Sequence, residues 1–456
     1  MTEGISLSES FVRGEATSRF WGLIGKGFGI ASTFLILASL TPYQYGVWFL
    51  FLSFYEIFSQ VLALGAGVVK NDVMRFIGAS DYRRAKRLFC EYHTVRIILS
   101  VILWAFFFFG APLLSFRYTP DFIIVIRVAS FLFLLEFASS FAQAILTTQF
   151  RFGAAARVIA YAKTSQLIVL ICYFYFSYIG VKEVIFSLAI SIISSVILIL
   201  PTVLHEWRPW RERKALGGEW LVFKTMRGHG KWDISRSFVS HITSRVQPFV
   251  IKILLNTEAA GIYGVAKSLV ELLLSFLSVD TLSSLVPRQI QTPGKMRTIF
   301  VFGSKYLFIA SIAFIIVGAL GAAVLFNLLF GNYLPALPFF YLLALILPAQ
   351  AIGQMIDVFL ITWQRQKFTF IRSLVRSTLW LALLVLLLPI AGLWGAVSAE
   401  VFVVLISVIW SYAYLVKLEP AFRPKSQELF SFGANDKEIR DVVFRNFINI
   451  IKLIRR

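Results

Sequence analysis

The stretch LTPYQYGVWFLFLSFYEIFSQ, residues 40–60, decides the fold class, because it is apolar over enough consecutive positions to cross a bilayer. A transmembrane helix needs about 20 residues of this kind, and runs of similar length recur along nearly the whole chain. The stretch also carries Glu56 near its middle, where a carboxylate in contact with lipid is costly. It therefore predicts a membrane-spanning helix whose charged side chain faces water or other helices.

The composition extends this prediction to the whole chain. Of its 456 residues, 58% are hydrophobic and 15% are charged, and the mean hydropathy is +0.78, whereas a soluble domain is usually about 45–50% apolar and about 25% charged. The polar N-terminus has no cleavable signal-peptide pattern, so the first span is expected to drive insertion. We predict an all-α integral membrane protein with about 12 transmembrane helices. The predicted spans are 20–39, 44–69, 93–115, 121–148, 158–179, 182–204, 232–255, 258–286, 303–330, 336–362, 374–391 and 394–418.

The formal net charge of +20 is distributed in a way that argues against a nucleic-acid partner. Lys and Arg concentrate in alternate connections between the predicted spans, and the outer loops carry only Arg117 and Lys182. The positive-inside rule describes this asymmetry in membrane proteins. It predicts that both termini are cytoplasmic, with attraction to anionic lipid as a further contribution.

The longest polar interruption, residues 205–231, follows six predicted spans and precedes six more. It is interpreted as a cytoplasmic linker between an N-lobe, residues 1–204, and a C-lobe, residues 232–418. If the first lobe is shifted along the sequence without gaps, so that position 46 falls on position 261, eight of its less common residues fall on identical residues of the second lobe. This match predicts that the two lobes are repeats. The pairs are Gly46 and Gly261, Glu56 and Glu271, Tyr118 and Tyr333, Pro120 and Pro335, Thr147 and Thr362, Gln149 and Gln364, Arg157 and Arg372, and Gly180 and Gly395. Because six crossings separate equivalent helices, the two six-helix lobes form a parallel repeat, an arrangement common in transporters.

Residues 419–456 form a polar, basic tail. Its apolar residues recur at helical spacing beside Lys and Arg, and Asn435 with Glu438 resembles a helix-capping arrangement. The pattern predicts a basic amphipathic helix on the inner leaflet, with a frayed polar tail as the alternative.

Eleven of the charged residues inside the predicted spans are singled out as candidate site residues. The cations are Lys26, Arg127, Arg245, Lys252 and Lys267, and the acids are Glu56, Glu136, Glu271, Asp280, Asp357 and Glu400. A central Lys, Arg or Asp costs roughly 2.5–3.5 kcal/mol on insertion scales, and such residues usually face a bundle interior or an aqueous cavity. Their number predicts a hydrated, charged cavity.

Helical spacing arranges many of these charges in polar stripes, of which the richest lie on the first two helices of each predicted lobe. The stripes are Gly22, Lys26, Gly29 and Thr33; Ser53, Glu56 and Gln60; Glu136, Ser140, Gln143 and Thr147; Ser237, His241, Arg245 and Lys252; and Gln350, Gln354 and Asp357. The small residues of the first stripe fit either close helix packing or a bulky ligand. Lys26, Arg245 and Lys252 have no carboxylate four residues away, which favours a role in neutralising an anionic ligand.

Structural interpretations stay open for the other charges. Lys267 and Glu271 are four residues apart and can form a neutral pair. Arg127 can extend to the outer surface from the start of its span. Glu400, like the acid at position 280, can bond a neighbouring helix.

Several signatures of other function classes are absent from the sequence. There is no Walker loop, so ATP is not expected to drive the process directly. No zinc-ligand cluster is visible, and His241 fits a packing or hydrogen-bonding role better than a proton relay or a metal ligand. Cys90 and Cys172 are interpreted as packing residues without a disulfide framework. No cofactor is predicted, and no carboxylate pair stands out for acid/base chemistry.

Three motifs resemble elements of the polysaccharide biosynthesis proteins, the Wzx-type O-antigen flippases of the multidrug/oligosaccharidyl-lipid/polysaccharide exporter superfamily. LTPYQYGVW, residues 40–48, is similar to the Leu-x-Pro-x-x-Tyr/Phe-Gly element of their first outer turn. LNTEAAGIYGVAKSL, residues 255–269, resembles the Ala-Gly-Ile-Tyr element that opens their second half. GASDYRRAKRL, residues 78–88, is similar to their Gly-Asp-x-x-Lys-Ala connection. The resemblance covers about residues 15–418, and Lys70 and the long basic tail depart from it.

The resemblance implies a V-shaped, MATE-like pair of lobes in the bacterial cytoplasmic (inner) membrane. The implied activity is not enzymatic: an undecaprenyl-pyrophosphate-linked oligosaccharide is moved by alternating access from the cytoplasmic to the outer leaflet, for O-antigen or another surface polysaccharide. The implied partners are this anionic lipid, the bilayer, H⁺ or Na⁺ as a coupling ion, and polysaccharide polymerase or chain-length proteins. By position, the cationic substrate path comprises Lys26, Arg127, Arg245, Lys252 and Lys267, and the polar or ion-coupling residues are Glu56, Gln60, Glu136, His241, Glu271 and Asp357.

Three competing classes share part of this pattern. An ion-coupled multidrug and toxin exporter would have the same lobes, but it should favour acids over unpaired cations in its cavity. A major-facilitator transporter also has twelve spans, but the connection after the second span lacks that family's Gly-x-x-x-Asp-Arg-x-Gly-Arg-Arg element. An integral membrane enzyme of polysaccharide assembly would need a substantial catalytic segment, which the short outer loops do not provide.

Overall fold

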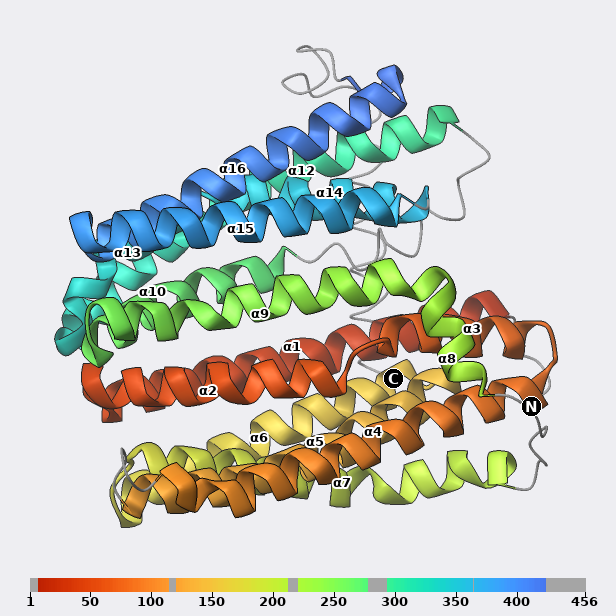
Figure 1. Cartoon of the computed structure of the whole chain (residues 1–456), viewed down its shortest axis with the longest axis horizontal. Helices are drawn as coiled ribbons and strands as arrows, with labels where there is room; N and C mark the ends of the chain where they lie inside the picture. The colour runs from red at the N-terminus through yellow and green to blue at the C-terminus, as the bar shows by residue number, and fades with distance from the viewer. Residues whose placement is uncertain (1–6, 115–119, 212–219, 278–292, 364, 424–456) are drawn as a thin grey trace. The chain divides into compact units, whose positions relative to one another are not determined.

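The computed structural model describes residues 7–114, 120–211, 220–277, 293–363 and 365–423 of the chain, and every regular element in these ranges is a helix (Figure 1). The all-α prediction is therefore confirmed for the part of the chain that is described. Asp280 lies outside the described residues, and so does nearly all of the predicted amphipathic tail, residues 419–456.

Each predicted span overlaps one helix or a consecutive pair. The long helices are α1 (Leu7–Ser39), α2 (Pro42–Leu62) with α3 (Ala66–Gly78), α4 (Tyr82–Gly110), α5 (Pro120–Thr148), α6 (Phe152–Phe176), α7 (Val181–Arg211), α9 (Lys231–Leu254), α10 (Thr257–Phe276), α12 (Pro293–Leu328), α13 (Leu337–Ala344) with α14 (Leu347–Thr362), α15 (Gln366–Ala391) and α16 (Leu393–Leu418). The short segments are η1 (Ala111–Leu114), α8 (Leu221–Thr225), the π-helical η2 (Met226–Gly230), η4 (Gly331–Ala336) and η5 (Pro420–Phe422).

The chain is a multi-pass membrane protein. Ten of the described helical stretches are long and apolar enough to cross a membrane, and an eleventh joins them if the pair Gly331–Ala344 and Leu347–Thr362, bent by 46°, counts as one span. The helix α9 is not among them, because Arg236, Arg245 and Lys252 interrupt its apolar residues. Its 24 residues extend over about 36 Å, which is longer than a hydrocarbon core of about 30 Å. The length of α9 therefore still fits the predicted count of about 12 spans.

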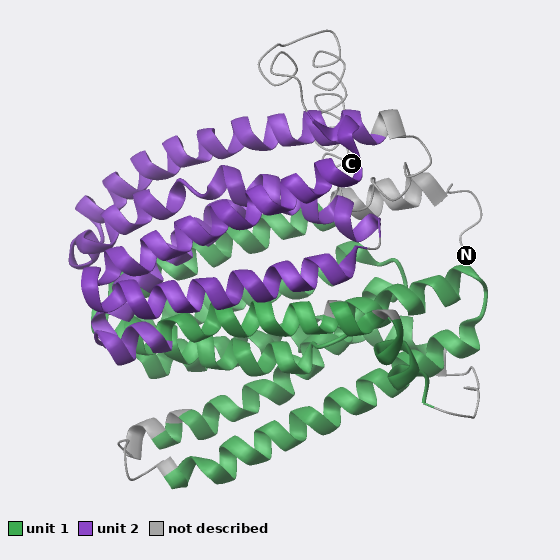
Figure 2. Cartoon of the chain, turned by 45° about the horizontal axis from the view of Figure 1, so that its top comes forward, with its two compact units in different colours: residues 1–248 green, residues 249–456 purple. Residues whose placement is uncertain are grey.

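The structure divides into two compact units, residues 1–248 and 249–456, which Figure 2 shows in different colours. The first unit contains α1 to α8, and the second contains α10 and α12 to α16. The division falls inside α9, so this helix contributes to both units. The predicted boundary between the lobes lies in the linker, residues 205–231, and this boundary stays a prediction.

Helix boundaries recur at the offset of the sequence repeat. The helix α2 begins at Pro42, and α10 begins at Thr257, the position onto which the offset places Pro42. Both are capped by the preceding residue, because Thr41 Oγ1 and Asn256 Oδ1 each accept a hydrogen bond from the backbone amide three residues further on, at 3.3 and 2.7 Å. At the same offset, Phe152, the first residue of α6, corresponds to the residue just after Gln366, the first residue of α15. This agreement supports an internal duplication.

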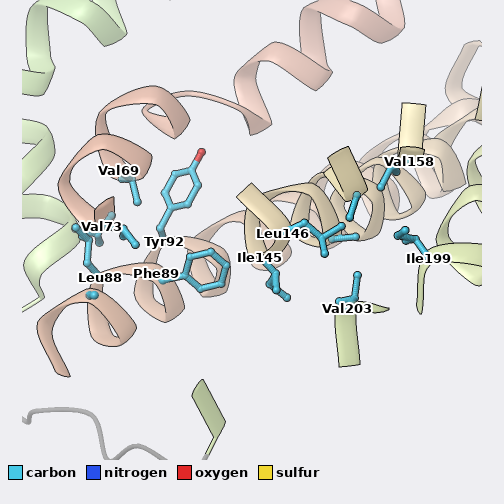
Figure 3. Packing of buried hydrophobic residues seen from close by; sticks show 14 residues of the cluster. Val69, Val73, Leu88, Phe89, Tyr92, Ile145, Leu146, Val158, Ile199 and Val203 are labelled. Carbon is cyan, nitrogen blue, oxygen red and sulfur yellow. The ribbon is translucent and has the colours of Figure 1, made fainter. Parts of the chain in front are cut away.

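Buried hydrophobic residues hold the helices of each unit together. In the first unit, α3 to α7 contribute to one cluster, in which Val73, Leu88 and Leu146 are completely buried (Figure 3). In the second unit, a cluster centred on Met355 and Phe359 of α14 packs against α12 and α16. These cores hold several of the helices that carry charged residues, among them α5, α6, α14 and α16.

The second predicted span is interrupted by a turn between α2 and α3, where the sequence indicates one continuous helix. Gly65 in this turn has φ +78°, in the left-handed region that glycine adopts readily. Carbonyl groups freed by the turn accept hydrogen bonds from α4: Arg96 Nε lies 2.8 Å from the Leu62 oxygen, and the Tyr92 hydroxyl lies 3.3 Å from the Leu64 oxygen. Because lipid offers no hydrogen bonds to the backbone, these donors stabilise the turn.

The connection that leads into α9 packs against the same turn. A Cβ atom at Gly65 would lie 2.8 Å from Met226 Cε in η2. Just before η2, the Val222 backbone amide donates to Glu91 Oε2 of α4 at 3.0 Å, and Glu91 also forms an ion pair with Arg87 at 2.7 Å. The connection is thus attached to the first unit at α3 and α4.

The glycines of α1 permit close packing against α6. A Cβ at Gly25 would lie 3.3 Å from the Ala160 Cα, and a Cβ at Gly29 would lie 3.6 Å from the Lys163 Cδ. Small residues at such crossings let two membrane helices approach closely. Gly25 lies outside the predicted stripe. Of the two glycines within it, Gly29 packs closely against α6, while a Cβ at Gly22 would have no neighbour within 4 Å.

Gly395→Ala is expected to destabilise the protein by about 1–3 kcal/mol, the usual cost of overpacking. Its added Cβ would overlap the Leu387 carbonyl oxygen, a backbone atom that cannot rotate away. Gly321→Ala in α12 is the matched control, because its Cβ meets nothing within 4 Å. Thermal unfolding of the purified variants in detergent measures the difference, and equal unfolding midpoints for the two would contradict the prediction.

Candidate functional site

The first unit contains a group of charged and polar side chains within its membrane helices. This first ion cluster consists of Tyr55 and Glu56 of α2, Glu136 of α5, Lys163 of α6 and Arg245 of α9. Arg245 forms an ion pair with Glu56, and the two side chains keep 24% and 28% of their exposure. The pair is therefore only partly buried.

Glu56 interacts with cations from two different helices. In addition to its ion pair with Arg245 of α9, it interacts electrostatically with Lys163 of α6. Lys163 Nζ lies 3.4 Å from Gln166 Oε1 on the same helix. One carboxylate that interacts with two cations can exchange ion-pair partners.

The tyrosine next to Glu56 connects it to a second acid. The Tyr55 hydroxyl donates a hydrogen bond to Glu136 Oε2 at 3.0 Å. With two carboxylates and two cations, the five side chains carry no formal net charge, although they lie among apolar helices. Mutual neutralisation of this kind lowers the cost of keeping charges in the membrane.

The second unit contains a second group of charged and polar side chains, the second ion cluster. Its residues do not correspond, at the repeat offset, to those of the first ion cluster. Its members are Tyr263 and Lys267 of α10, Asp357 of α14, Arg372 and Arg376 of α15, and Glu400 and Ser411 of α16. The Tyr263 hydroxyl donates a hydrogen bond to Glu400. Lys267 Nζ lies 3.2 Å from Glu400 Oε1, and the two side chains are only 13% and 12% exposed.

Arg372 is the most extensively bonded residue of this second cluster. Its Nη1 atom lies 2.6 Å from Asp357 Oδ1 and 2.7 Å from Ser411 Oγ, and its Nη2 atom lies 2.8 Å from Asp357 Oδ2. Arg376, one turn along α15, interacts electrostatically with Glu400 and with Asp357. Three cations and two carboxylates give the second ion cluster a formal charge of +1.

Two sequence interpretations need correction. Lys267 is paired with Glu400, while Glu271 is exposed, so the pair between positions 267 and 271 is not formed. Arg245, which has no carboxylate four residues away, is paired with Glu56. In both cases the partner comes from another helix, which spacing along one helix cannot reveal.

Two more predicted site residues have contacts that the structure gives. His241, one turn before Arg245 on α9, interacts electrostatically with Arg245. Arg127 Nε lies 3.3 Å from the Phe108 carbonyl oxygen, with its guanidinium over the Phe108 ring. The remaining predicted residues are Lys26 and Gln60, both partly buried, and Lys252, which is exposed, as His241 is. The two cysteines are free thiols, and Cys172 is exposed, contrary to its predicted packing role.

The sequence interpretation missed several charged residues that the structure buries. Arg96, 5% exposed, lies three residues after His93 and four before Ser100, so a polar stripe was present in the sequence. The predicted span 374–391 starts about two turns too late, since α15 begins at Gln366. Arg372 therefore lies inside the helix but just before the predicted span. Lys163 lies inside a predicted span, and only its individual charge could have indicated it.

No group of three or more His, Cys, Asp or Glu side chains that could hold a metal ion occurs in the described part of the chain. The two ion clusters instead combine carboxylates with guanidinium, ammonium and phenol groups. Such groups can bind an anion, pass a proton or exchange ion-pair partners.

Residues 36–288 match a family model described as polysaccharide biosynthesis protein, which covers more than half of the chain. The chain belongs to this family. A comparison with curated proteins gave no match.

Solved structures show which fold this polysaccharide biosynthesis family protein adopts. It is similar to the inward-facing conformation of a multidrug resistance MATE family transporter of the MOP superfamily, with a TM-score of 0.69, 14% identity, and coverage of 87% of this chain and 96% of the other. It is also similar to the outward-facing conformation of such a transporter, with a TM-score of 0.63, 14% identity, and coverage of 93% and 100%.

A third similar structure is a MOP superfamily transporter from Pyrococcus furiosus Vc1 (DSM3638), whose description states that the reverse polarity of its binding pocket suggests a different function. Its TM-score is 0.59 at 14% identity, with coverage of 92% of this chain and 96% of that one. These likenesses show that this polysaccharide biosynthesis family protein has the MATE transporter fold.

Proposed function

We propose that the protein is a flippase for an undecaprenyl-pyrophosphate-linked oligosaccharide. It translocates the repeat unit from the cytoplasmic to the outer leaflet of a bacterial inner membrane, for O-antigen, lipopolysaccharide or another surface polysaccharide. The two six-helix lobes move by alternating access, both termini are cytoplasmic, and the protein catalyses no covalent step.

The family membership is the observation that carries this proposal, because it connects a transporter fold to polysaccharide biosynthesis. The ion clusters add chemical support. A substrate with a pyrophosphate needs cations within the membrane, and Arg245 is 24% exposed there. We assign head-group contact to Arg245, Lys26 and Lys252, and a structural role to Lys267, which Glu400 holds.

The energy source and the protein partners are part of the same proposal. Glu56 and Glu136 lie in one cluster with two cations, so a proton or Na⁺ that neutralised one acid would free a cation for the substrate. The anionic lipid is expected to pass to a polysaccharide polymerase and chain-length proteins on the outer side.

Deletion of the gene is expected to trap lipid-linked oligosaccharide at the cytoplasmic leaflet, because synthesis continues while translocation stops. Protection of the labelled oligosaccharide from a membrane-impermeant glycosidase, in intact spheroplasts and in inverted vesicles, measures the leaflet. Complementation with the wild-type gene is the control.

Two outcomes would contradict the proposal and favour its alternatives. Oligosaccharide that is translocated but left unpolymerised would indicate an enzyme of polysaccharide assembly. Normal oligosaccharide distribution with increased sensitivity to cationic drugs would indicate an ion-coupled multidrug exporter of the same superfamily.

A further inference from the structure

Arg157 of α6 has a buried nitrogen atom, Nε, that no described residue bonds. Arg157 follows Gly153 by four residues and precedes Ala160 by three, and these two residues contact Thr17 and Gly25 of α1. Helical spacing therefore places Arg157 on the face of α6 that packs against α1.

The repeat shows what an arginine at this position binds. Arg157 corresponds to Arg372 at the repeat offset, and the Arg372 guanidinium binds Asp357 and Ser411. At the same offset, Asp357 corresponds to Ala142 and Ser411 corresponds to Val196. The first unit has therefore kept the arginine and replaced both of its partners by apolar residues.

The helices that would form the equivalent pair are adjacent in the first unit. Ala142 of α5 and Val158, the neighbour of Arg157 on α6, belong to the same buried hydrophobic cluster, part of which Figure 3 shows. The helices α5 and α6 thus pack against each other, as α14 and α15 do in the second unit, and position 142 holds no carboxylate.

The Nε atom of Arg372 is also buried without a hydrogen bond, so the two arginines differ in their Nη atoms. Those of Arg372 bind Asp357 and Ser411, whereas no ion pair of Arg157 is found among the described residues. A guanidinium without a counter-ion is costly in a membrane protein, so an anion from outside the chain is the expected partner.

Arg157 lies five residues into α6, about 7.5 Å along its axis, at the helix end where Arg151 and Glu206 form a 2.9 Å ion pair. Arg157 also comes one residue before the predicted span 158–179, so we infer that it lies at the depth of the lipid head groups, whose anionic part is a phosphate. Guanidinium groups bind phosphate through two parallel hydrogen bonds.

We propose that Arg157 binds a lipid-borne phosphate in place of the carboxylate that its repeat-equivalent Arg372 binds. Assignment of this phosphate to the pyrophosphate of the transported lipid rests on the proposed function, while a membrane phospholipid is the other source of the same chemistry. The duplication has thus produced one neutralised arginine in the second unit and one ligand-binding arginine in the first.

Binding to the purified protein in neutral detergent tests this proposal. Undecaprenyl pyrophosphate and phosphatidylglycerol are titrated separately, with phosphatidylcholine as a third arm, and the shift in the thermal unfolding midpoint gives the affinity. Arg157→Gln is expected to weaken binding of the preferred phosphate lipid at least tenfold, and Arg157→Lys to recover part of it. Preference for undecaprenyl pyrophosphate identifies the transported lipid as the source, and equal or stronger binding of phosphatidylglycerol identifies the membrane.

Ala142→Asp supplies the missing carboxylate from within the chain. It is expected to fold, and to abolish the binding that depends on Arg157, because the new carboxylate competes with the phosphate. Ala142→Asn is the matched control of equal size without charge, and it should keep most of the binding. Ala142→Asp combined with Arg157→Gln should unfold at a lower temperature than Ala142→Asp alone, because the new acid then has no cation.

The proposal is overturned if Arg157→Gln and Ala142→Asp both bind the phosphate lipids as wild type does. This outcome differs from failure of the proposed function. A deletion strain with normally distributed oligosaccharide would refute the flippase while binding through Arg157 could persist, and normal flipping with Arg157-independent binding would refute only this site.

Discussion

Glu400→Ala is expected to lower the free energy of unfolding by about 3–5 kcal/mol, the range observed when one partner of a buried ion pair is removed. Glu400 accepts from Tyr263 and pairs with Lys267 at 3.2 Å, where the Lys267 side chain is only 13% exposed. The substitution leaves this ammonium without its carboxylate among apolar helices. Equilibrium unfolding in mixed detergent micelles, followed by tryptophan fluorescence, measures the change.

The double variant Lys267→Met with Glu400→Gln is the control for this first prediction. Replacing both members of a buried pair by neutral residues of similar volume is often nearly neutral for stability. The double variant should therefore recover most of the lost stability and should still export the oligosaccharide. Loss of export at normal stability and abundance would contradict the structural role and return Lys267 to the substrate path.

Asp357→Ala is expected to have an effect of similar size, about 3–5 kcal/mol. Asp357 bonds Arg372 through both carboxylate oxygens, at 2.6 and 2.8 Å, and the Arg372 side chain is 9% exposed. Without the acid, the Ser411 hydroxyl, at 2.7 Å, is the one partner of the guanidinium that remains among the described residues. The same unfolding measurement applies.

Asp357→Asn is the matched control, because it keeps one acceptor oxygen and the side-chain volume. Its loss of stability should be clearly smaller than that of Asp357→Ala. An Asp357→Ala protein as stable as wild type would show that Arg372 needs no carboxylate, and it would also weaken the comparison from which the role of Arg157 is inferred.

The sequence predicts the helices well because a bilayer imposes a single strong pattern. Apolar runs and charged connections identify every long helix, including α9, where cations interrupt the apolar residues. The turn at Gly65 escapes this pattern, because an apolar turn in the middle of a span has the same composition as the helix around it. The turn depends on hydrogen bonds from Arg96 and Tyr92, which lie on another helix.

The candidate site is predictable only in part. Composition and helical spacing identify Glu56, Arg245, Lys267 and Asp357 as charges within the membrane. Their partners lie on other helices, and those of Glu56 and Lys267 are distant in the sequence, so local spacing carries no information about these pairs. Arg372 falls outside its predicted span, because charged residues in the first turns of a helix resemble a connection. The repeat offset is the signal that could have found it, since it pairs Arg372 with Arg157.

The turn between α2 and α3 has a mechanical consequence. Met226, the first residue of η2, rests on Gly65 at the corner of this turn, and α9 continues from η2 into the second unit. A displacement of η2 would therefore act directly on the bend in the second span. A bulkier residue at position 65 would clash with Met226. It would disturb both the connection into α9 and the bend between α2 and α3.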